Sequence, residues 1–326
     1  MGSTAAVPAR LVDLLRACTF TFAAALAVVL FVANLIVEAS FASWEALPET
    51  LADLAPFAII AMATAPSVVT GGLDLGAGPV LSLTNVMMVA VLIPHGLGAP
   101  GASIPILLAM GAGIGALSGA VITYLRLPAI ITGLCALFVI SGVAQEILLT
   151  PEQAPANWTS HLGDKVGPVP GALITMAVPL IVWFALRRTP FVRAMFSVGG
   201  DAPTAFAAGM NVHAVRILAY ALGGLFAAIA GLALTGLVRS ADSSLGLQYT
   251  LIAIAAVSLG GTPIGGGRGG LVGALLGAAC IYLIQNLLSG LSISAQWLNV
   301  VYGCVLIFAV ILSAQLSPRR LRGPAG

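Results

Sequence analysis

The sequence predicts an all-α membrane protein with about ten transmembrane helices, an internal two-fold repeat and interrupted helices. Apolar residues make up 60% of the 326 residues and charged residues only 7%, and the mean hydropathy is +1.09. These values lie far outside the range of soluble globular domains. The apolar residues form runs close to the roughly 20 residues that a helix needs to cross a bilayer. A glycine-rich motif also occurs twice.

The runs define the expected helices along one polytopic domain of residues 1–326. Two runs are short, and each adjoins one copy of the glycine motif, so we expect these helices to be interrupted. The pseudo-repeats cover about 40–150 and 216–316, and a cytoplasmic connector at 187–215 lies between them. The expected long spans are 17–37, 51–70, 104–124, 128–149, 169–186, 216–238, 270–289 and 295–315, and the short ones are 79–94 and 248–260.

The basic residues predict the orientation, because short cytoplasmic loops carry an excess of lysine and arginine. With ten spans and both termini in the cytoplasm, only Lys165 and Arg239 fall outside. A model with nine or eleven spans would put one basic cluster on the wrong side. The residues expected inside are Arg10, Arg16, Arg126, Arg187, Arg188, Arg193, Arg216, Arg268, Arg319, Arg320 and Arg322.

The glycine motif reads GGLDLGAG at 71–78 and returns within LGGTPIGGGRGG at 259–270, where a shift of 189 residues (71 to 260) superimposes the first glycine pairs. In lipid, irregular backbone is tolerated only where protein or a water-filled cavity satisfies the peptide groups. Duplicated interrupted helices therefore point to a transport path. The alternative is close helix packing. Such packing is expected for two further series, Gly111, Gly115 and Gly119, and Gly269, Gly273 and Gly277.

Asp74, inside the first motif, is interpreted either as a functional carboxylate at membrane depth or as a cap for the helix entered at Pro79. An ion pair with Arg268 is conceivable. Other polar residues either line the path or hydrogen-bond neighbouring helices, and the second role is preferred for Gln285 and Asn286. The candidate path residues are Gly71, Gly72, Asp74, Asn85, Thr132, Gln145, Glu146, Gln248, Ser258, Gly260 and Gly261.

The connector contains its own short helix, expected at 202–208. Asp201 is a suitable N-cap, Pro203 is tolerated in the first turn, and Gly209 can end the helix in a left-handed conformation. So short a helix outside the bilayer needs a partner surface to be ordered. We interpret it as a docking helix for a soluble protein, with passive burial in the headgroup layer as the alternative. The coupling candidates are Asp201, Thr204, Ala208, Gly209 and Met210.

Catalysis, cofactor binding and metal binding are not predicted for this chain. The single lysine, Lys165, lies in an outer loop, so a P-loop is missing. The three histidines lie in loops without a nucleophile or paired carboxylates. The four cysteines lie in apolar runs and are interpreted as small hydrophobic residues. The expected partner is membrane lipid, and no nucleic-acid partner is indicated.

Four segments together resemble the membrane permeases of ribose-type ABC importers. GGLDLGAG at 71–78 is similar to the family element GGIDLS-VG, and LPAIITGLC at 127–135 is similar to LPPFIATLG. GGTPIGGGRGG at 260–270 is similar to GG-S--GG-G, and AFAAGMNVHAVR at 205–216 matches the end of the coupling segment, A--GI-V--V. Two departures are Gly76, where the family has serine, and DAPTAF, where a more acidic NEEAAR is common. The second departure bears on the identity of the partner.

The resemblance implies a permease subunit of an ATP-binding-cassette importer in the bacterial plasma membrane, with ATP and Mg²⁺ bound by separate cytosolic ATPase subunits. It also implies a second permease copy or paralogue and an extracytoplasmic solute-binding protein. A monosaccharide is the expected solute, and an autoinducer, a nucleoside or a polyol remains open. The alternative mechanism is a secondary transporter driven by an ion gradient, for which Asp74 and Glu146 are the candidate carboxylates.

Overall fold

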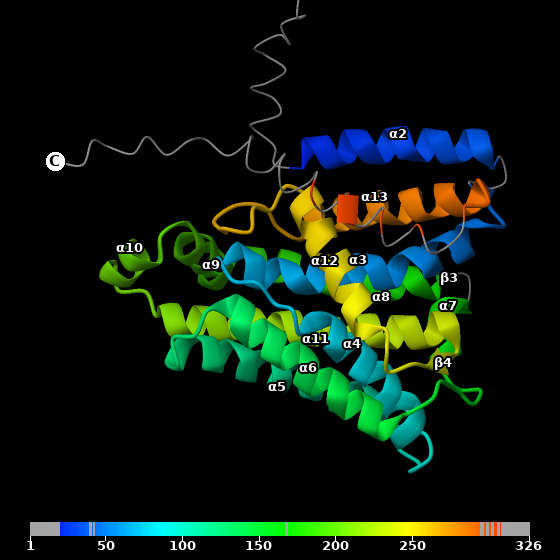
Figure 1. The fold of residues 1–326 in the computed structure, drawn as a ribbon, viewed down its shortest axis with the longest axis horizontal. Helices are drawn as coiled ribbons and strands as arrows, with labels where there is room; N and C mark the ends of the chain where they lie inside the picture. Colours follow the sequence, from blue (N-terminus) through cyan, green and yellow to red (C-terminus); the bar gives the residue numbers. More distant parts are fainter. Residues whose placement is uncertain are drawn as a thin grey trace, which may run out of the picture.

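The protein is a bundle of apolar helices, most of which lie roughly along one common direction, while α12 crosses them steeply (Figure 1). The computed structural model describes residues 20–38, 41, 43–166 and 169–293, with the single positions 297, 300, 303, 304 and 307. The helices are α2 (Thr21–Val37), α3 (Leu47–Val69), α4 (Ala77–Val86), the π-helix η1 (Met87–Leu92), α5 (Pro100–Tyr124), α6 (Ala129–Ile147), α7 (Ser160–Gly163), α8 (Gly171–Arg187), α9 (Pro190–Gly200), α10 (Ala202–Ala207), α11 (Val212–Val238), α12 (Gly246–Leu259) and α13 (Leu271–Gly290).

The lengths of these helices confirm an all-α membrane protein. Within the described residues, α3, α5, α6, α11 and α13 are long and apolar enough to cross a membrane, and α8 with α9 forms a sixth candidate bent by 86°. Three apolar helices are shorter: α2, α12 and the continuous pair of α4 and η1. The last two correspond to the short runs predicted beside the glycine motifs. The span expected at 295–315 lies largely outside the described residues.

Helix α11 is at the centre of the bundle and packs against α5, α3 and α4. The predicted small-residue series on α5 is confirmed, because Gly111, Gly115 and Gly119 each face the backbone of α11 so closely that a Cβ atom would overlap it. Van der Waals contact between close backbones stabilises helix pairs in lipid, where the hydrophobic effect is absent. Large apolar side chains on α2, α6 and α8 remain exposed, as expected for surfaces that face lipid.

The second predicted series needs a correction. Gly273 and Gly277 do face Gly260 and Ala256 of α12 across a tight helix contact. Gly269, however, lies before the first turn of α13 and has a φ of +94°, so it is not on that helix face. The expected span at 270–289 is displaced by one residue from α13, which runs from Leu271 to Gly290, and Gly269 belongs to the loop before this helix.

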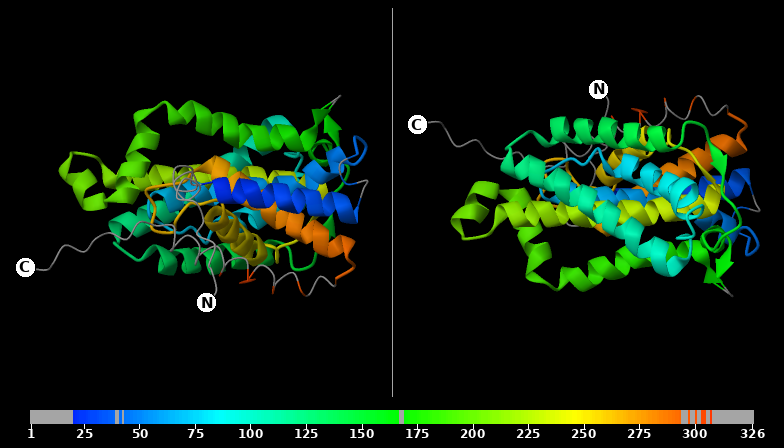
Figure 2. Two further views of the ribbon diagram at one scale, coloured as in Figure 1. Left: turned by 90° about the horizontal axis from the view of Figure 1, so that it is seen from above. Right: turned by 90° about the horizontal axis from the view of Figure 1, so that it is seen from below.

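The two ends of the bundle differ. At one end, β1 (Glu152–Gln153) pairs with β4 (Ser240–Ala241), and β2 (Lys165–Val166) pairs with β3 (Val169–Pro170), close to α7. We call this the hairpin end. At the other end, called the connector end, α9 and α10 join α8 to α11, and both views in Figure 2 show α10 projecting beyond the long helices.

The contact between α5 and α11 predicts a selective loss of stability. A Cβ atom on Gly115 would overlap the carbonyl oxygen of Tyr220, whereas Gly113 has nothing within 4 Å of the same position. We expect Gly115→Ala to lower the free energy of unfolding by about 1–3 kcal/mol, as other overpacked contacts do. Gly113→Ala should be neutral or slightly stabilising, because alanine favours a helix over glycine by about 1 kcal/mol. Thermal unfolding of the purified variants checks both, and equal losses would contradict the packing.

Candidate functional site

Helices α3 and α12 end in the same hydrogen-bonded turn. Gly71 has a φ of +78° and Gly261 a φ of +81°. The amide of Gly71 donates to the carbonyl of Val68 at 2.9 Å, and that of Gly72 to Ser67 at 3.0 Å. In α12, Gly261 donates to Ser258 at 3.1 Å and Thr262 to Val257 at 3.2 Å. These are two Schellman motifs, in which a left-handed residue, usually glycine, satisfies the last carbonyls of a helix.

The turns correct the register of the predicted glycine repeat. The left-handed residue is Gly71 in one turn and Gly261 in the other, which separates equivalent positions by 190 residues (71 to 261). Superimposing the glycine pairs by letter gives 189 and pairs Gly71 with Gly260. Gly260 instead occupies the C-cap position that Thr70 holds at the end of α3. Letter identity and backbone conformation therefore differ by one residue.

The first turn meets the loop that follows the second turn at the connector end and forms what we call the glycine junction, made of Val69–Gly72, Gly199–Gly200 and Gly265–Gly267. The amide of Gly267 donates to the carbonyl of Val69 at 2.9 Å. Gly266 lies against Gly71, and Gly199, near the end of α9, lies against both Val69 and Gly267. Backbone therefore contacts backbone with no side chain between the three segments.

Gly199 is a residue that the sequence reasoning missed. A Cβ atom at this position would overlap the carbonyl oxygen of Val69 and the amide nitrogen of Gly267, whereas one on Gly200 would meet nothing within 4 Å. The available signal was a third glycine pair, in SVGGDAP at 197–203. Its contact with the two motif copies depends on segments far apart in the chain, so the pair alone could not reveal it.

The connector holds two helices rather than the single one predicted. Helix α9 buries Val192, Met195 and Val198 and leads directly into α10. The predicted N-cap is confirmed, because Asp201 accepts hydrogen bonds from the amide of Thr204 at 3.2 Å and from its hydroxyl at 2.8 Å. The predicted stop is also confirmed, since Gly209 has a φ of +82°. The helix ends at Ala207 rather than Ala208.

The exposed surface of α10 is small and has no cluster of charged side chains. Thr204, Ala208 and Gly209 are exposed, and Met210 is half-buried. Phe206, which was not among the predicted coupling residues, is 67% exposed. A large apolar side chain on a projecting short helix is suited to a protein contact.

Asp74 is buried beside the first turn, with 4% of its surface exposed. Its Oδ1 accepts a hydrogen bond from the amide of Gly76 at 2.9 Å, immediately before α4 begins. The carboxylate therefore braces the entry to that helix, close to the capping role considered from the sequence. The ion pair found among the described residues is Asp164 with Arg239, so the conceivable pair of Asp74 and Arg268 is not formed.

The remaining path candidates occupy three different environments. Asn85 is fully buried, and its amide donates to Thr235 at 2.9 Å and to the carbonyl of Ser240 at 2.8 Å. Thr132 and Ser258 are buried, and the hydroxyl of Thr132 has no hydrogen-bond partner. Three candidates are exposed, on α6 and at the start of α12: Gln145, Glu146 and Gln248. Gly260 packs against Gly273 of α13.

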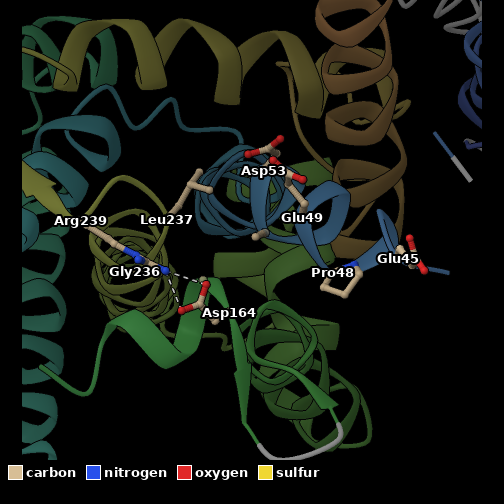
Figure 3. A pocket seen from close by; sticks show the side chains of 10 residues that line it. Glu45, Pro48, Glu49, Asp53, Asp164, Gly236, Leu237 and Arg239 are labelled. Carbon is tan, nitrogen blue, oxygen red and sulfur yellow. Dashed lines mark hydrogen bonds and ion pairs between the residues drawn. The ribbon is translucent and has the colours of Figure 1, made fainter. Parts of the chain in front are cut away.

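A polar cavity of about 580 Å³ opens at the hairpin end (Figure 3). Glu49 and Asp53 line it from the first turns of α3, and Glu45 lines it from the turn before that helix. Asp164 pairs with Arg239 on the opposite side, with an N–O distance of 2.6 Å. These carboxylates can accept hydrogen bonds from hydroxyl groups or attract cationic side chains. In the part of the chain that the structure describes, no cluster of three or more histidine, cysteine, aspartate or glutamate residues is arranged to hold a metal ion.

Comparison with known families decides the class of protein to which this architecture belongs. The family model described as "Branched-chain amino acid transport system / permease component" matches residues 46–310. The chain belongs to this family of permeases. The matched range includes α3 to α13 and therefore both glycine turns and the connector.

Curated relatives of the permease agree with this assignment. This chain is 34% identical over 262 residues to the ribose import permease protein RbsC of Bacillus subtilis strain 168, and the alignment covers 77% of this chain and 79% of the relative. It is 31% identical over 267 residues to RbsC of Escherichia coli K12, covering 78% and 81%. The inner membrane ABC transporter permease protein YjfF of E. coli K12 is 31% identical over 287 residues, covering 85% and 86%. No solved structure shows a significant match.

The glycine junction predicts a local effect of substituting Gly199 in the permease. Gly199→Ala should separate Val69 from Gly267 and break their hydrogen bond, because the new methyl group would occupy the same space. We expect the amide of Gly267 to exchange with deuterium at least about tenfold faster, which corresponds to about 1.4 kcal/mol of local opening. Gly200→Ala is the matched control. Unchanged protection in Gly199→Ala, or the same loss in both variants, would contradict the junction.

Proposed function

We propose that the permease is the membrane subunit of an ATP-binding-cassette importer, and that it forms the path for a small polar solute, in the first instance a monosaccharide. One observation carries this proposal: the capped helix α10 projects from the bundle and is connected through α9 to the first glycine turn and to the loop that follows the second. Two relatives that are named ribose import permeases support the class of solute.

The proposed coupling runs from a cytosolic ATPase subunit through α10 to the helices that line the path. Asp201, Thr204, Ala208, Gly209 and Met210 form the coupling segment, and the exposed Phe206 extends its contact surface. ATP and Mg²⁺ would bind to the ATPase, and no cofactor is assigned to this chain. Movement of α10 would reach α3 and the loop at Gly265–Gly267 through Gly199. Backbones in direct contact transmit a displacement, because no flexible side chain between them can absorb it.

The proposed path lies between two permease copies or between this chain and a paralogue. Gln145, Glu146 and Gln248 are exposed among apolar neighbours such as Val143 and Leu251, which are 46% and 45% exposed. A carboxylate facing lipid is expensive, so a partner subunit that encloses an aqueous path would explain this surface. The residues assigned to the path and its walls are Gly71, Gly72, Asp74, Asn85, Thr132, Gln145, Glu146, Gln248, Ser258, Gly260 and Gly261.

We place the connector end in the cytoplasm of a bacterium and the hairpin end outside the plasma membrane. Arginines at the boundaries of α5, α8, α9 and α11 gather at the connector end, in agreement with the excess of positive charge in cytoplasmic loops. The proposal retains ten spans, cytoplasmic termini and two repeats. The repeats would run parallel, because α3 ends at the glycine junction and the loop that follows α12 leads into it. The hairpin-end cavity would then meet the solute-binding protein.

Reconstitution tests the function directly. The permease is purified from native membranes together with any bound ATPase, and ribose uptake into vesicles is measured with the binding protein present. We expect uptake only when ATP is supplied on the ATPase side, and at least about tenfold less when the ATPase is removed. Full uptake by the permease alone in vesicles with a proton or sodium gradient would contradict the proposal and favour an ion-coupled transporter.

Substitution of Gly209 tests the coupling role of α10. Gly209 and Gly96 have φ values of +82° and +73°, and neither would meet an atom within 4 Å of an added Cβ. Valine should therefore introduce similar backbone strain of about 1–3 kcal/mol at either position. We expect Gly209→Val to abolish most ATP-driven uptake while the protein remains in the membrane. Gly96→Val, in the turn between η1 and α5, should retain uptake. Normal uptake by Gly209→Val would exclude α10 as the coupling element.

A further inference from the structure

A second cavity, separate from the hairpin-end cavity, lies at the connector end and is basic. It has a volume of about 390 Å³ and is enclosed by the end of α5, the start of α6 and the start of α11, with Gly71 and Gly72 on its inner side. Arg126, His213 and Arg216 line it, and no acidic side chain does. Its charge therefore favours an anionic ligand.

The arginines of this cavity have no carboxylate partner within the described residues. The one ion pair found there joins Asp164 to Arg239, which line the cavity at the opposite end of the bundle. Asp74, on the neighbouring turn, does not line the cavity, and its carboxylate accepts a hydrogen bond from the amide of Gly76. Arg126 and Arg216 are therefore available for charge-assisted hydrogen bonds with an external anion.

Tyr220 supplies an independent indication of a ligand. It lines the inner side of the cavity, and only 1% of its surface is exposed. The backbone amide of Leu73 lies near its hydroxyl oxygen, but the hydroxyl proton has no acceptor. Leaving a buried hydroxyl proton without an acceptor is unfavourable, because the group has lost its hydrogen bond to water. An oxygen of a bound anion would accept this hydrogen bond and remove that cost. A phosphate group has enough acceptor oxygens to contact a phenol and two guanidinium groups together.

The surroundings of the opening favour a lipid over a free phosphate ion. Tyr124 and Leu125 are 69% and 64% exposed beside Arg126, and Leu218 is 54% exposed beside α11's basic turn. The rings of Tyr124 and His213 stack with centroids 5.7 Å apart and hold the ends of α5 and α11 together. A phospholipid could place its phosphate in the cavity and its acyl chains along these apolar side chains. Basic pockets between membrane helices commonly bind anionic headgroups in this way.

We propose that this connector-end cavity binds the phosphate headgroup of an anionic phospholipid. The bound headgroup would bridge the link between α5 and α6 to the first turns of α11. These turns follow directly after α10, and the inner side of the cavity belongs to the glycine junction. Anionic lipid would therefore stabilise the arrangement of the connector end. The inference rests on the cavity and on membrane insertion, and it holds whichever solute the permease transports.

Lipid binding by the purified full-length permease tests the proposal. The protein is delipidated in a neutral detergent, and bound dioleoylphosphatidylglycerol and dioleoylphosphatidylcholine are counted by native mass spectrometry. We expect the anionic lipid to bind at least about fivefold more tightly and to raise the melting temperature more. Arg216→Gln should weaken its binding by about fivefold, which corresponds to about 1 kcal/mol for one arginine at an anionic surface.

Three further variants make the result specific. Arg187→Gln removes an exposed arginine at the connector end that does not line the cavity, and it should bind like the wild type. Tyr220→Phe removes only the hydroxyl and should weaken binding by about two- to fivefold. Arg126→Gln, at an exposed position, gives the same test as Arg216→Gln if the latter variant fails to fold.

Several outcomes would overturn the proposal. These are equal binding of the two lipids, and an equal loss in Arg187→Gln and Arg216→Gln. Displacement of the lipid by millimolar inorganic phosphate, with the same rise in melting temperature, would make the cavity a site for a small anion. Unchanged lipid binding by Arg216→Gln, together with loss of a co-purifying protein, would assign the basic surface to a protein partner.

Discussion

Peptide groups freed at the end of a helix must find hydrogen-bond partners within the protein when lipid surrounds the bundle. At the ends of α3 and α12 the chain meets this requirement with two Schellman turns. A further carbonyl at the end of α3, that of Val69, accepts a hydrogen bond from the amide of Gly267, which lies in the loop that follows the second turn. The need to satisfy backbone in a medium without water thus joins the two halves of the chain at a single place.

The same place is where the connector enters the bundle. Because Gly199 has no side chain, α9 approaches the Val69 carbonyl and the Gly267 amide directly. A side chain there would separate the three segments, and displacement of α10 would then be taken up by rotamer changes. Direct backbone contact leaves little freedom of this kind. Local interactions define the two ends of α10, since Asp201 caps its first turn and Gly209 ends it in a left-handed conformation.

Acidic and basic side chains gather at opposite ends of the molecule, and each end has a cavity lined by the side chains that gather there. Carboxylates dominate at the hairpin end, where Arg239 is balanced by Asp164. At the connector end, Arg126 and Arg216 have no such balance among the described residues, and the buried Tyr220 lies beside them. Between these ends, glycines of α5 pack directly against the backbone of α11, so this contact buries no charged side chain.

The class of fold, most helix positions and the capping of α10 could be predicted from the sequence, because they depend on local quantities. The length of an apolar run decides whether a helix can span lipid, and Asp201 lies within three residues of the amide it caps. The left-handed stop at Gly209 follows from the same local chemistry. Even the close packing of Gly111 and Gly115 was visible from their spacing on one helix face.

Tertiary structure decided what depends on residues far apart in the chain. Only the folded bundle brings Val69, Gly199 and Gly267 together, leaves Asp74 without an ion pair to Arg268, and places Tyr220 and Arg126 on the same cavity. It also set the equivalence of Gly71 with Gly261, since φ is a property of the folded backbone and not of the letter. Contacts of this kind arise from the packing of whole helices, and a pattern within one segment carries no information about which distant segment it will meet.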